Sequence, residues 1–232
     1  MRVTFRHNDT VQVFRLGTTS NEKICSNRKE KIVQTYTFSR KQFELIAYGG
    51  DYTMRNFFSN ADSNCLDCPF NSFGKCYTHA YSQYSGFLSM LKSIAKQYPT
   101  FESIPDTYDL DKLISMVSGK YLRLGSYGEI SIIPHEVIEG MTSVAKSWTG
   151  YTHQWRKVDL GKYAMASTHD KAEQIEAAVL GYRSFIVSDE KQDVVNCPAS
   201  KEAGYKSTCD KCNLCSGTLG TKSKKSIFIL TH

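Results

Sequence analysis

The chain has 232 residues, of which 41% are hydrophobic and 12% aromatic, so its composition is that of a globular domain and not of a disordered segment. Its 29 basic and 23 acidic residues leave a net charge of +6, which permits a nucleotide or nucleic acid as partner without requiring one. No apolar run approaches the roughly 20 residues of a membrane span, and the first residues lack the apolar stretch of a secretory signal. We therefore expect a cytoplasmic protein with no membrane partner, in which thiols stay reduced.

The first 77 residues predict a β-hairpin followed by a loosely structured segment. Apolar side chains alternate over residues 1–17 on either side of a polar turn, which is typical of two antiparallel strands. Residues 18–31 lack apolar periodicity and predict a loop. Residues 32–48 are rich in β-branched and aromatic side chains and predict a strand and a short helix. Residues 49–77 contain three cysteines and little sign of regular structure.

From residue 78 onwards, helices and strands are expected to alternate. The spacing of apolar residues predicts helices over 81–98 and 109–117. Further along the chain we predict strands at 121–124, 149–153, 163–167, 183–188 and 227–230, and helices at 135–148 and 170–180. Strands that alternate with helices favour a parallel sheet with right-handed crossovers, and five such strands can curl into part of a barrel.

The predicted fold class is therefore α/β, a partial parallel (β/α) barrel with an N-terminal β-hairpin and cysteine-rich metal-binding loops. Residues 1–77 would hold the hairpin and the first cysteines, and residues 78–232 the partial barrel and the remaining cysteine group, packed as one compact unit.

Four cysteines near the end of the chain form its most specific motif. Cys209, Cys212 and Cys215 recur at a spacing of three, and Cys197 precedes Pro198 upstream of them. Overlapping Cys-x2-Cys units with a further Cys-Pro are typical of 4Fe–4S ferredoxins, whereas zinc usually takes two separated Cys-x2-Cys pairs. We predict that these four cysteines, the C-terminal thiol group, bind an iron–sulfur cluster, with zinc as the alternative. Disulfides are the less favoured interpretation, because the chain is long, lacks a secretory signal and clusters its cysteines.

Three further cysteines, Cys65, Cys68 and Cys76, form the N-terminal thiol group. His79 follows Cys76 with two residues between them and could complete a Cys3His zinc site, although it could equally be a helix residue with no ligand role. Alternatively, the three thiolates hold a cluster with one open iron, to which substrate or cofactor can bind. The two thiol groups could also meet in space and share ligands. Cys25 has no partner in spacing and is interpreted as a plain thiol.

Polar residues follow several of the predicted strands, where parallel α/β folds place their working groups. Because these strand ends meet at one edge of a sheet, we expect the polar side chains to line one pocket. The glycines of the Gly125-x2-Gly128 turn are candidates for cofactor binding, although their spacing is too short for a phosphate loop. The catalytic candidates are Arg123, Glu129, His153, Ser167 and His232.

Several of these candidates have a structural alternative. Arg123 lies inside an apolar strand and needs either Glu129, as an ion-pair partner, or an anionic ligand. His153 lies between two tryptophans, where it is either an acid, base or metal ligand, or a hydrogen-bonded residue in aromatic packing, which spacing alone favours. The Ser167-Thr168-His169-Asp170 segment contains the residue types of a triad, but an N-cap for the following helix explains it better.

Several segments of the chain together carry a resemblance. They are Ser20 to Lys23, Cys65 to Pro69, Gly74 to Tyr77, Arg123 to Glu129, Trp148 to Trp155, Met165 to Ser167, Gly181 to Phe185 and Cys197 to Gly217. In their order and spacing they resemble a family of uncharacterised proteins from tailed phages and prophages. The resemblance extends over about residues 18 to 232 and implies a phage product that works in the host cytosol.

In shape this family is similar to partial (β/α) barrels of the radical S-adenosylmethionine type, with cysteines before the barrel. That superfamily carries Cys-x3-Cys-x2-Cys, where this chain has Cys-x2-Cys-x7-Cys. This departure argues against S-adenosylmethionine as a cofactor.

Two functions from different classes follow from these patterns. In the first, the chain is an enzyme whose iron–sulfur centre, near the carboxyl ends of the strands, catalyses redox or radical chemistry on a nucleotide or nucleic acid. In the second, it is a non-catalytic module, stabilised by zinc, that binds nucleic acid or a host protein.

Overall fold

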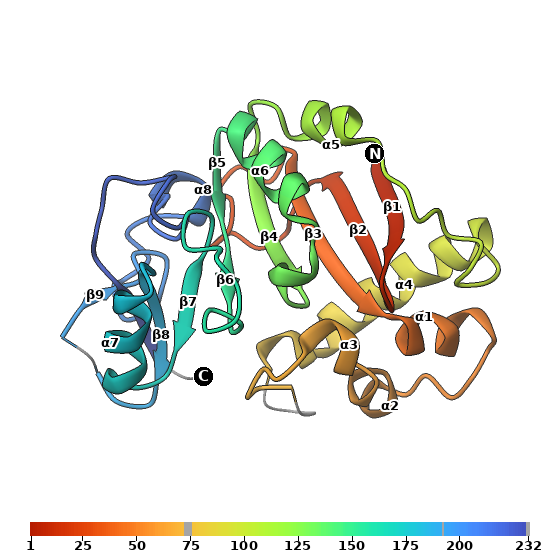
Figure 1. Cartoon of the computed structure of the whole chain (residues 1–232), viewed down its shortest axis with the longest axis horizontal. Coiled ribbons are helices and arrows are strands. Elements are labelled where there is room, and N and C mark those ends of the chain that lie inside the picture. Colours follow the sequence, from red (N-terminus) through yellow and green to blue (C-terminus); the bar gives the residue numbers. More distant parts are fainter. Residues whose placement is uncertain (72–75, 192, 231–232) are drawn as a thin grey trace.

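The computed structural model describes residues 1–71, 76–191 and 193–230 of the chain, in which the strands form two five-stranded sheets (Figure 1). The first sheet has the order β1-β2-β3-β4-β5 and the second the order β6-β7-β8-β10-β9. The strands of the first sheet are β1 (Arg2–His7), β2 (Thr10–Gly17), β3 (Ile32–Ser39), β4 (Tyr121–Tyr127) and β5 (Ser147–Thr149). Those of the second are β6 (Tyr151–Thr152), β7 (Met165–Thr168), β8 (Ser184–Ser188), β9 (Val195–Asn196) and β10 (Ile227–Leu230).

The first sheet begins with the predicted hairpin, which the structure confirms. β1 and β2 pair antiparallel around a turn in which Asn8 adopts a left-handed conformation with φ of 52°. β2 pairs antiparallel with β3, whereas β3, β4 and β5 pair in parallel. β3 is buried along its whole length, as its run of β-branched and aromatic residues predicts.

The second sheet is parallel in all its described pairings, and Gly150 joins it to the first. Gly150 lies between β5 and β6, and its carbonyl accepts the N–H of Met165 at 3.0 Å. The structure thus confirms a mixed α/β fold with parallel strands and crossover helices. The described strands do not close into a barrel, since they divide between two sheets.

Helices cover both faces of the first sheet and one side of the second (Figure 1). The helices are α1 (Arg40–Ala47), α2 (Met54–Ser59), α3 (Asp62–Cys65), α4 (Tyr81–Gln97), α5 (Leu110–Val117), α6 (His135–Val144), α7 (Lys171–Val179) and α8 (Cys209–Cys212), with short 3-10 turns at Tyr77–His79 and Ile130–Ile132. One core packs α1, α2 and α4 on the aromatic face of β2, β3 and β4. The other packs α5 and α6 on the opposite face and extends to α7.

Two local predictions were wrong. The predicted helix over 135–148 ends at Val144, because the chain turns there to pair with the start of β4. Trp148 lies instead in β5, opposite Leu122, and its indole N–H donates to the carbonyl of Tyr163 at 2.8 Å. The segment 49–77, predicted as irregular, contains α2 and α3. Thr53 caps α2 by accepting a side-chain hydrogen bond from a backbone N–H of its first turn.

The predicted boundary at residue 77 falls between parts of the chain that share one sheet, since β3 before it pairs with β4 after it. Among the described helices, none combines the length and apolar character needed to cross a membrane.

Candidate functional site

The four cysteines of the C-terminal thiol group come together in space. Burial raises the pKa of the Cys215 thiol, and a hydrogen bond from the Tyr151 hydroxyl opposes the rise. The negative charges that Cys197, Cys209 and Cys212 carry as thiolates raise the pKa of Cys215 further. These three thiols therefore lie near the thiol of Cys215. All eight cysteines of the chain belong to its described part, and none of them forms a disulfide.

Different elements of the fold hold this group in place. The backbone N–H of Cys209 donates to the carbonyl of Lys23 at 2.9 Å, and that of Cys197 donates to Phe228 in β10 at 2.8 Å. The carbonyl of Cys215 accepts the N–H of the residue between β5 and β6 at 3.0 Å. The fold thus anchors the C-terminal thiol group to segments that are distant from it in sequence.

The C-terminal thiol group lies beside the first residues of β4, with α8 next to β5 (Figure 1). Burial raises the pKa of Cys209 to about 11, and the positive charge of Arg123 opposes this rise. The charges of Cys209 and Cys215 also act on the buried Tyr121 hydroxyl. Arg123 therefore favours a thiolate at Cys209, as a metal ligand requires. The C-terminal thiol group therefore lies beside the amino-terminal half of β4 and next to the residue that follows β5.

The N-terminal thiol group also gathers in space. Burial raises the pKa of the Cys65 thiol, and the charges of Cys68 and Cys76 raise it further. Burial likewise raises the pKa of Cys68 to about 11. Cys65 ends α3, and its carbonyl accepts the N–H of Cys68 at 3.2 Å. The sulfur of Cys76 lies 3.0 Å from the hydroxyl of Thr78.

This second group lies at the carboxyl ends of β3 and β4. Asn64 in α3 is buried, and its carbonyl accepts the N–H of Glu129 at 2.7 Å while its amide donates to the carbonyl of Thr37 at 2.9 Å. Gly128 has φ of +82°, and a Cβ there would lie 2.7 Å from the Thr37 oxygen. The close approach of α3 to the sheet therefore depends on glycine at this position.

Glu129 is a buried carboxylate beside the N-terminal thiol group. Burial raises its pKa, and hydrogen bonds from the Thr152 hydroxyl and from backbone N–H groups oppose the rise. One oxygen accepts the N–H of His153 at 3.0 Å, and the other accepts the N–H of Ser131 at 3.2 Å. Glu129 thus holds the backbone at the end of β6 in place.

His153 faces the N-terminal thiol group. Its Nε2 atom lies 4.0 Å from the sulfur of Cys68. Nearby, Asp67 accepts hydrogen bonds from Gln154 and from Lys157, the latter at 2.5 Å, so the segment that carries Cys68 is fastened to the segment that follows β6. The contact between His153 and Cys68 favours a functional role for His153 over a role in aromatic packing alone.

His169 is a site residue that the sequence analysis assigned only to an N-cap segment. Its ring stacks on that of His153 at 5.7 Å and meets the edge of Phe70 at 5.0 Å. Burial lowers the pKa of His153 to about 4, and the charge of His169 lowers it further. The Nδ1 atom of His169 lies 3.3 Å from the carbonyl of Val187, and its Nε2 atom is buried without a hydrogen-bond partner among the described residues. The N-cap prediction is also confirmed, since Asp170 caps α7. The position of His169, directly after β7 as His153 follows β6, is the signal that could have identified it.

The two thiol groups lie one after the other along two segments of the chain. Tyr151, in β6, interacts with the C-terminal group, and His153, which follows β6, lies near Cys68 of the N-terminal group. On β4, Arg123 acts on the C-terminal group and Tyr127, at the end of the strand, on the N-terminal group.

Cys25 has acidic neighbours that its sequence position does not reveal. It is buried, and its sulfur lies 3.5 Å from a carboxylate oxygen of Asp210. Together with Glu30, these residues form a set of three potential ligand atoms that all lie within 4.8 Å of one another. The thiol also donates to the carbonyl of Asn27 at 3.4 Å, and burial raises its pKa. These contacts fit a protonated buried thiol, in agreement with the interpretation from sequence.

Gly125 and Ser167, two other residues predicted to belong to the site, make contacts with neighbouring segments of the fold. The N–H of Gly125 donates to the hydroxyl of Thr35 at 2.8 Å, and a Cβ at Gly125 would lie 2.5 Å from a methyl carbon of Ile130. The carbonyl of Ser167 accepts the indole N–H of Trp155 at 3.1 Å. A role for these positions in catalysis or cofactor binding stays a prediction.

His79 stacks on Phe58 with 3.9 Å between ring centroids, inside the aromatic core. This position fits the interpretation of His79 as a packed helix residue. His232 lies outside the residues that the structure describes.

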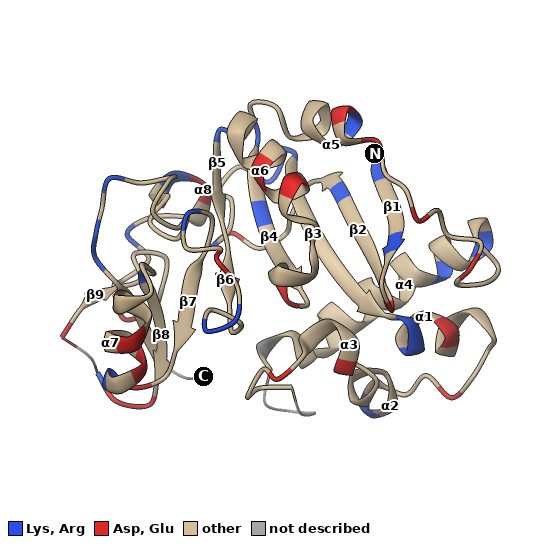
Figure 2. Cartoon of the chain, in the orientation of Figure 1, with Lys and Arg blue, Asp and Glu red and all other residues tan. Residues whose placement is uncertain are grey.

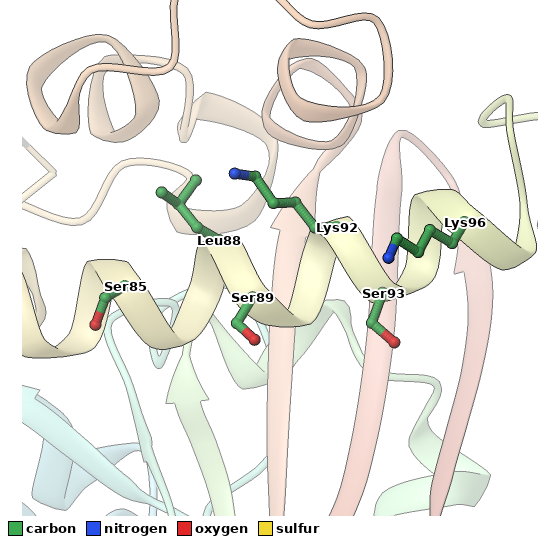
Figure 3. Close-up of a pocket in the computed structure, with 6 residues that line it drawn as sticks. All are labelled: Ser85, Leu88, Ser89, Lys92, Ser93 and Lys96. Carbon is green, nitrogen blue, oxygen red and sulfur yellow. The ribbon is translucent and has the colours of Figure 1, made fainter.

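Two surface depressions are lined by residues outside the thiol groups. One follows the exposed side of α4 and is lined by Ser85, Leu88, Ser89, Lys92, Ser93 and Lys96 (Figure 3). The other is lined by Arg183 and the loop 218–224. The guanidinium of Arg183 is buried and donates to the carbonyls of Gly217 and Lys225, so it holds that loop. Figure 2 shows Asp and Glu residues on α7, and Lys and Arg residues along the loops near α8.

Comparison of the chain with family models, with curated proteins and with solved structures found no match.

Proposed function

We propose that the chain is a metal-binding protein with two thiolate centres, of which at least one is an iron–sulfur cluster. The centre at the N-terminal thiol group is proposed to carry redox or radical chemistry on an anionic substrate such as a nucleotide or nucleic acid. The observation that carries this proposal is the gathering of seven cysteines without disulfides into two groups, of which the N-terminal one lies beside a buried carboxylate and an imidazole.

The different number of thiols in the two groups supports a division of roles. Four thiolates complete the coordination of one centre, as in structural sites, whereas three leave one position for another side chain or for substrate. The incomplete group is the one at the carboxyl ends of β3 and β4, where parallel α/β enzymes carry their chemistry. The complete group would stabilise the fold or relay electrons.

The spacing of the cysteines along the chain favours a cluster over zinc at the C-terminal thiol group. Cys209, Cys212 and Cys215 form overlapping Cys-x2-Cys units, with Cys197-Pro198 upstream, as in ferredoxins. Zinc usually takes two separated Cys-x2-Cys pairs.

Iron analysis of protein purified without oxygen tests this proposal. The wild-type chain is expected to contain iron and acid-labile sulfide and to absorb visible light near the charge-transfer bands of iron–sulfur clusters. Cys212→Ser is expected to lose the metal of the C-terminal group. Cys25→Ser is the matched control, because Cys25 belongs to neither group, and it is expected to retain all the iron.

Other outcomes would contradict the proposal in distinct ways. Zinc without iron would favour the alternative, a zinc-stabilised binding module. Loss of metal in Cys25→Ser and not in Cys212→Ser would assign the metal to the set of Cys25, Glu30 and Asp210. If binding to single-stranded nucleic acid is undetectable even at low salt, where electrostatic attraction is strongest, nucleic acid is not the partner.

A further inference from the structure

The geometry points to His153 as the nitrogen ligand that completes the N-terminal thiol group, giving a centre of three thiolates and one imidazole. This inference rests on the proposed function, since it requires the thiols of that group to bind metal. It differs from the expectation from sequence, in which His79 was the candidate for the fourth ligand.

The distance between His153 and Cys68 is close to that of two ligands on one ion. Tetrahedral coordination with metal–sulfur distances of about 2.3 Å and metal–nitrogen distances of about 2.0 Å separates sulfur from nitrogen by about 3.5 Å. The observed separation from Cys68 Sγ to His153 Nε2 is 4.0 Å. Metal binding would draw these two atoms about 0.5 Å closer together and would also draw in the other thiols of the group, because among the described residues no three of these ligand atoms lie within 4.8 Å of one another.

The backbone on both sides of this pair is fixed by independent contacts. The carboxylate of Glu129 accepts the N–H of His153 at 3.0 Å, and the N–H of Glu129 donates to the carbonyl of Asn64 in α3 at 2.7 Å. On the other side, the carboxylate of Asp67 accepts a hydrogen bond from the ammonium group of Lys157 at 2.5 Å. Glu129 therefore acts as a positioning residue that links the helix carrying Cys65 to the segment carrying His153.

The two rival histidines are less well placed. His79 lies with its ring against Phe58 at 3.9 Å, within the core formed by α1, α2 and α4. His169 has its Nδ1 atom 3.3 Å from the carbonyl of Val187, and its ring stacks on that of His153. The inference rests on the contact between His153 Nε2 and Cys68 Sγ.

Cadmium-113 NMR on the full chain tests the inference, with cadmium as the only metal added to the reduced, metal-free protein. The wild type is expected to give one signal from a four-thiolate centre and a second, upfield signal from the centre with three thiolates and one nitrogen. His153→Ala is expected to remove or shift the second signal alone and to weaken cadmium binding there by at least about 100-fold, the upper end of the loss seen for supporting residues.

Three further variants make the result specific. His153→Cys is expected to retain both centres and to move the second signal to the four-thiolate region, which a purely structural role of His153 would not produce. His79→Ala and His135→Ala, the latter an exposed residue on α6, are expected to leave both signals unchanged.

The outcomes separate this inference from the proposed function. If His153→Ala and His153→Cys both keep the wild-type signals, or if His79→Ala loses the second signal, His153 is not the ligand although the thiols bind metal. If the wild-type chain gives no bound cadmium signal, the proposed function itself fails, and the inference with it.

Discussion

At the scale of single residues, the decisive feature is the burial of the thiols that would bind metal. Burial raises the pKa of Cys68 and of Cys209 to about 11, so in the metal-free chain both are protonated at neutral pH. A metal ligand must be a thiolate, and metal binding therefore has to release protons from these groups. The positive charge of Arg123 beside Cys209 lowers the cost of that release.

The metal-free chain is expected to lose stability in alkaline solution. A thiol whose pKa is raised in the folded state contributes stability that is fully present below its ordinary pKa, and this stability is lost as the pH rises through the folded value. For Cys209 the window is from about pH 9 to about 11, and the loss is about 3 kcal/mol at 1.36 kcal/mol per pKa unit. Urea unfolding in the presence of a chelator and a reductant, at several values of pH, measures it.

The matched variant for this experiment is Cys209→Ser, whose free energy of unfolding is expected to fall less steeply over the same pH range. Equal slopes for the wild type and the variant would show that Cys209 is not a buried thiol in the folded chain.

At the scale of elements, the loop that follows α8 fixes Cys215 against the second sheet. The N–H groups of Thr218 and Leu219 donate to the carbonyls of Gly161 and Lys162 at 2.9 and 3.0 Å. Gly217 lies at the tightest point of this contact, with φ of +67°, and a Cβ there would lie 2.5 Å from the Lys162 oxygen. The loop therefore docks through backbone atoms, which leaves no space for a side chain.

Gly217→Ala is expected to destabilise the protein by about 3 kcal/mol or more, because it adds a steric clash with the backbone to the strain of a left-handed conformation. Gly181→Ala is the control, since Gly181 also has positive φ, +82°, but a Cβ there would meet no atom within 4 Å. Its cost is expected to be about 1 kcal/mol. Chemical denaturation of both variants measures the difference, and equal losses would mean that the loop does not dock as described.

At the scale of the whole molecule, the two sheets differ in what stabilises them. The first sheet is packed between helices on both faces, with two large apolar cores. Strands of the second sheet pack on a smaller cluster that contains Met165, Cys215 and Ile227, with Cys197 at its margin. The cysteines of the C-terminal group are thus part of the packing of that sheet, and metal binding would stabilise it directly.

Removal of metal is expected to act on one part of the molecule. Hydrogen exchange with and without a chelator should show faster exchange over β9, α8 and β10 in the metal-free chain, with little change in β2, β3 and β4. Peptide-resolved mass spectrometry measures both regions in one sample. Equal acceleration in the first sheet would mean that the two sheets unfold as one unit and that the metal stabilises the entire chain.

Local patterns in the sequence predicted those parts of the fold that depend on neighbouring residues. The hairpin of residues 1–17 follows from alternating apolar side chains, and the helices α4 and α5 follow from helical spacing. The end of α6 could not be predicted in this way. Trp148 continues the apolar pattern of that helix, but pairing with Leu122 in β4, distant in sequence, draws it into a strand.

By itself, the sequence determined that the chain folds as a mixed α/β protein and that its cysteines fall into groups with the spacing of metal ligands. Only the tertiary structure decided where each group lies, with the three thiols at the carboxyl ends of β3 and β4 and the four thiols beside the start of β4. It also decided that His153 faces Cys68, a residue 85 positions away. The physical reason is that spacing along the chain restricts which side chains one short segment can bring together, whereas contacts between distant segments depend on how the strands pair and pack.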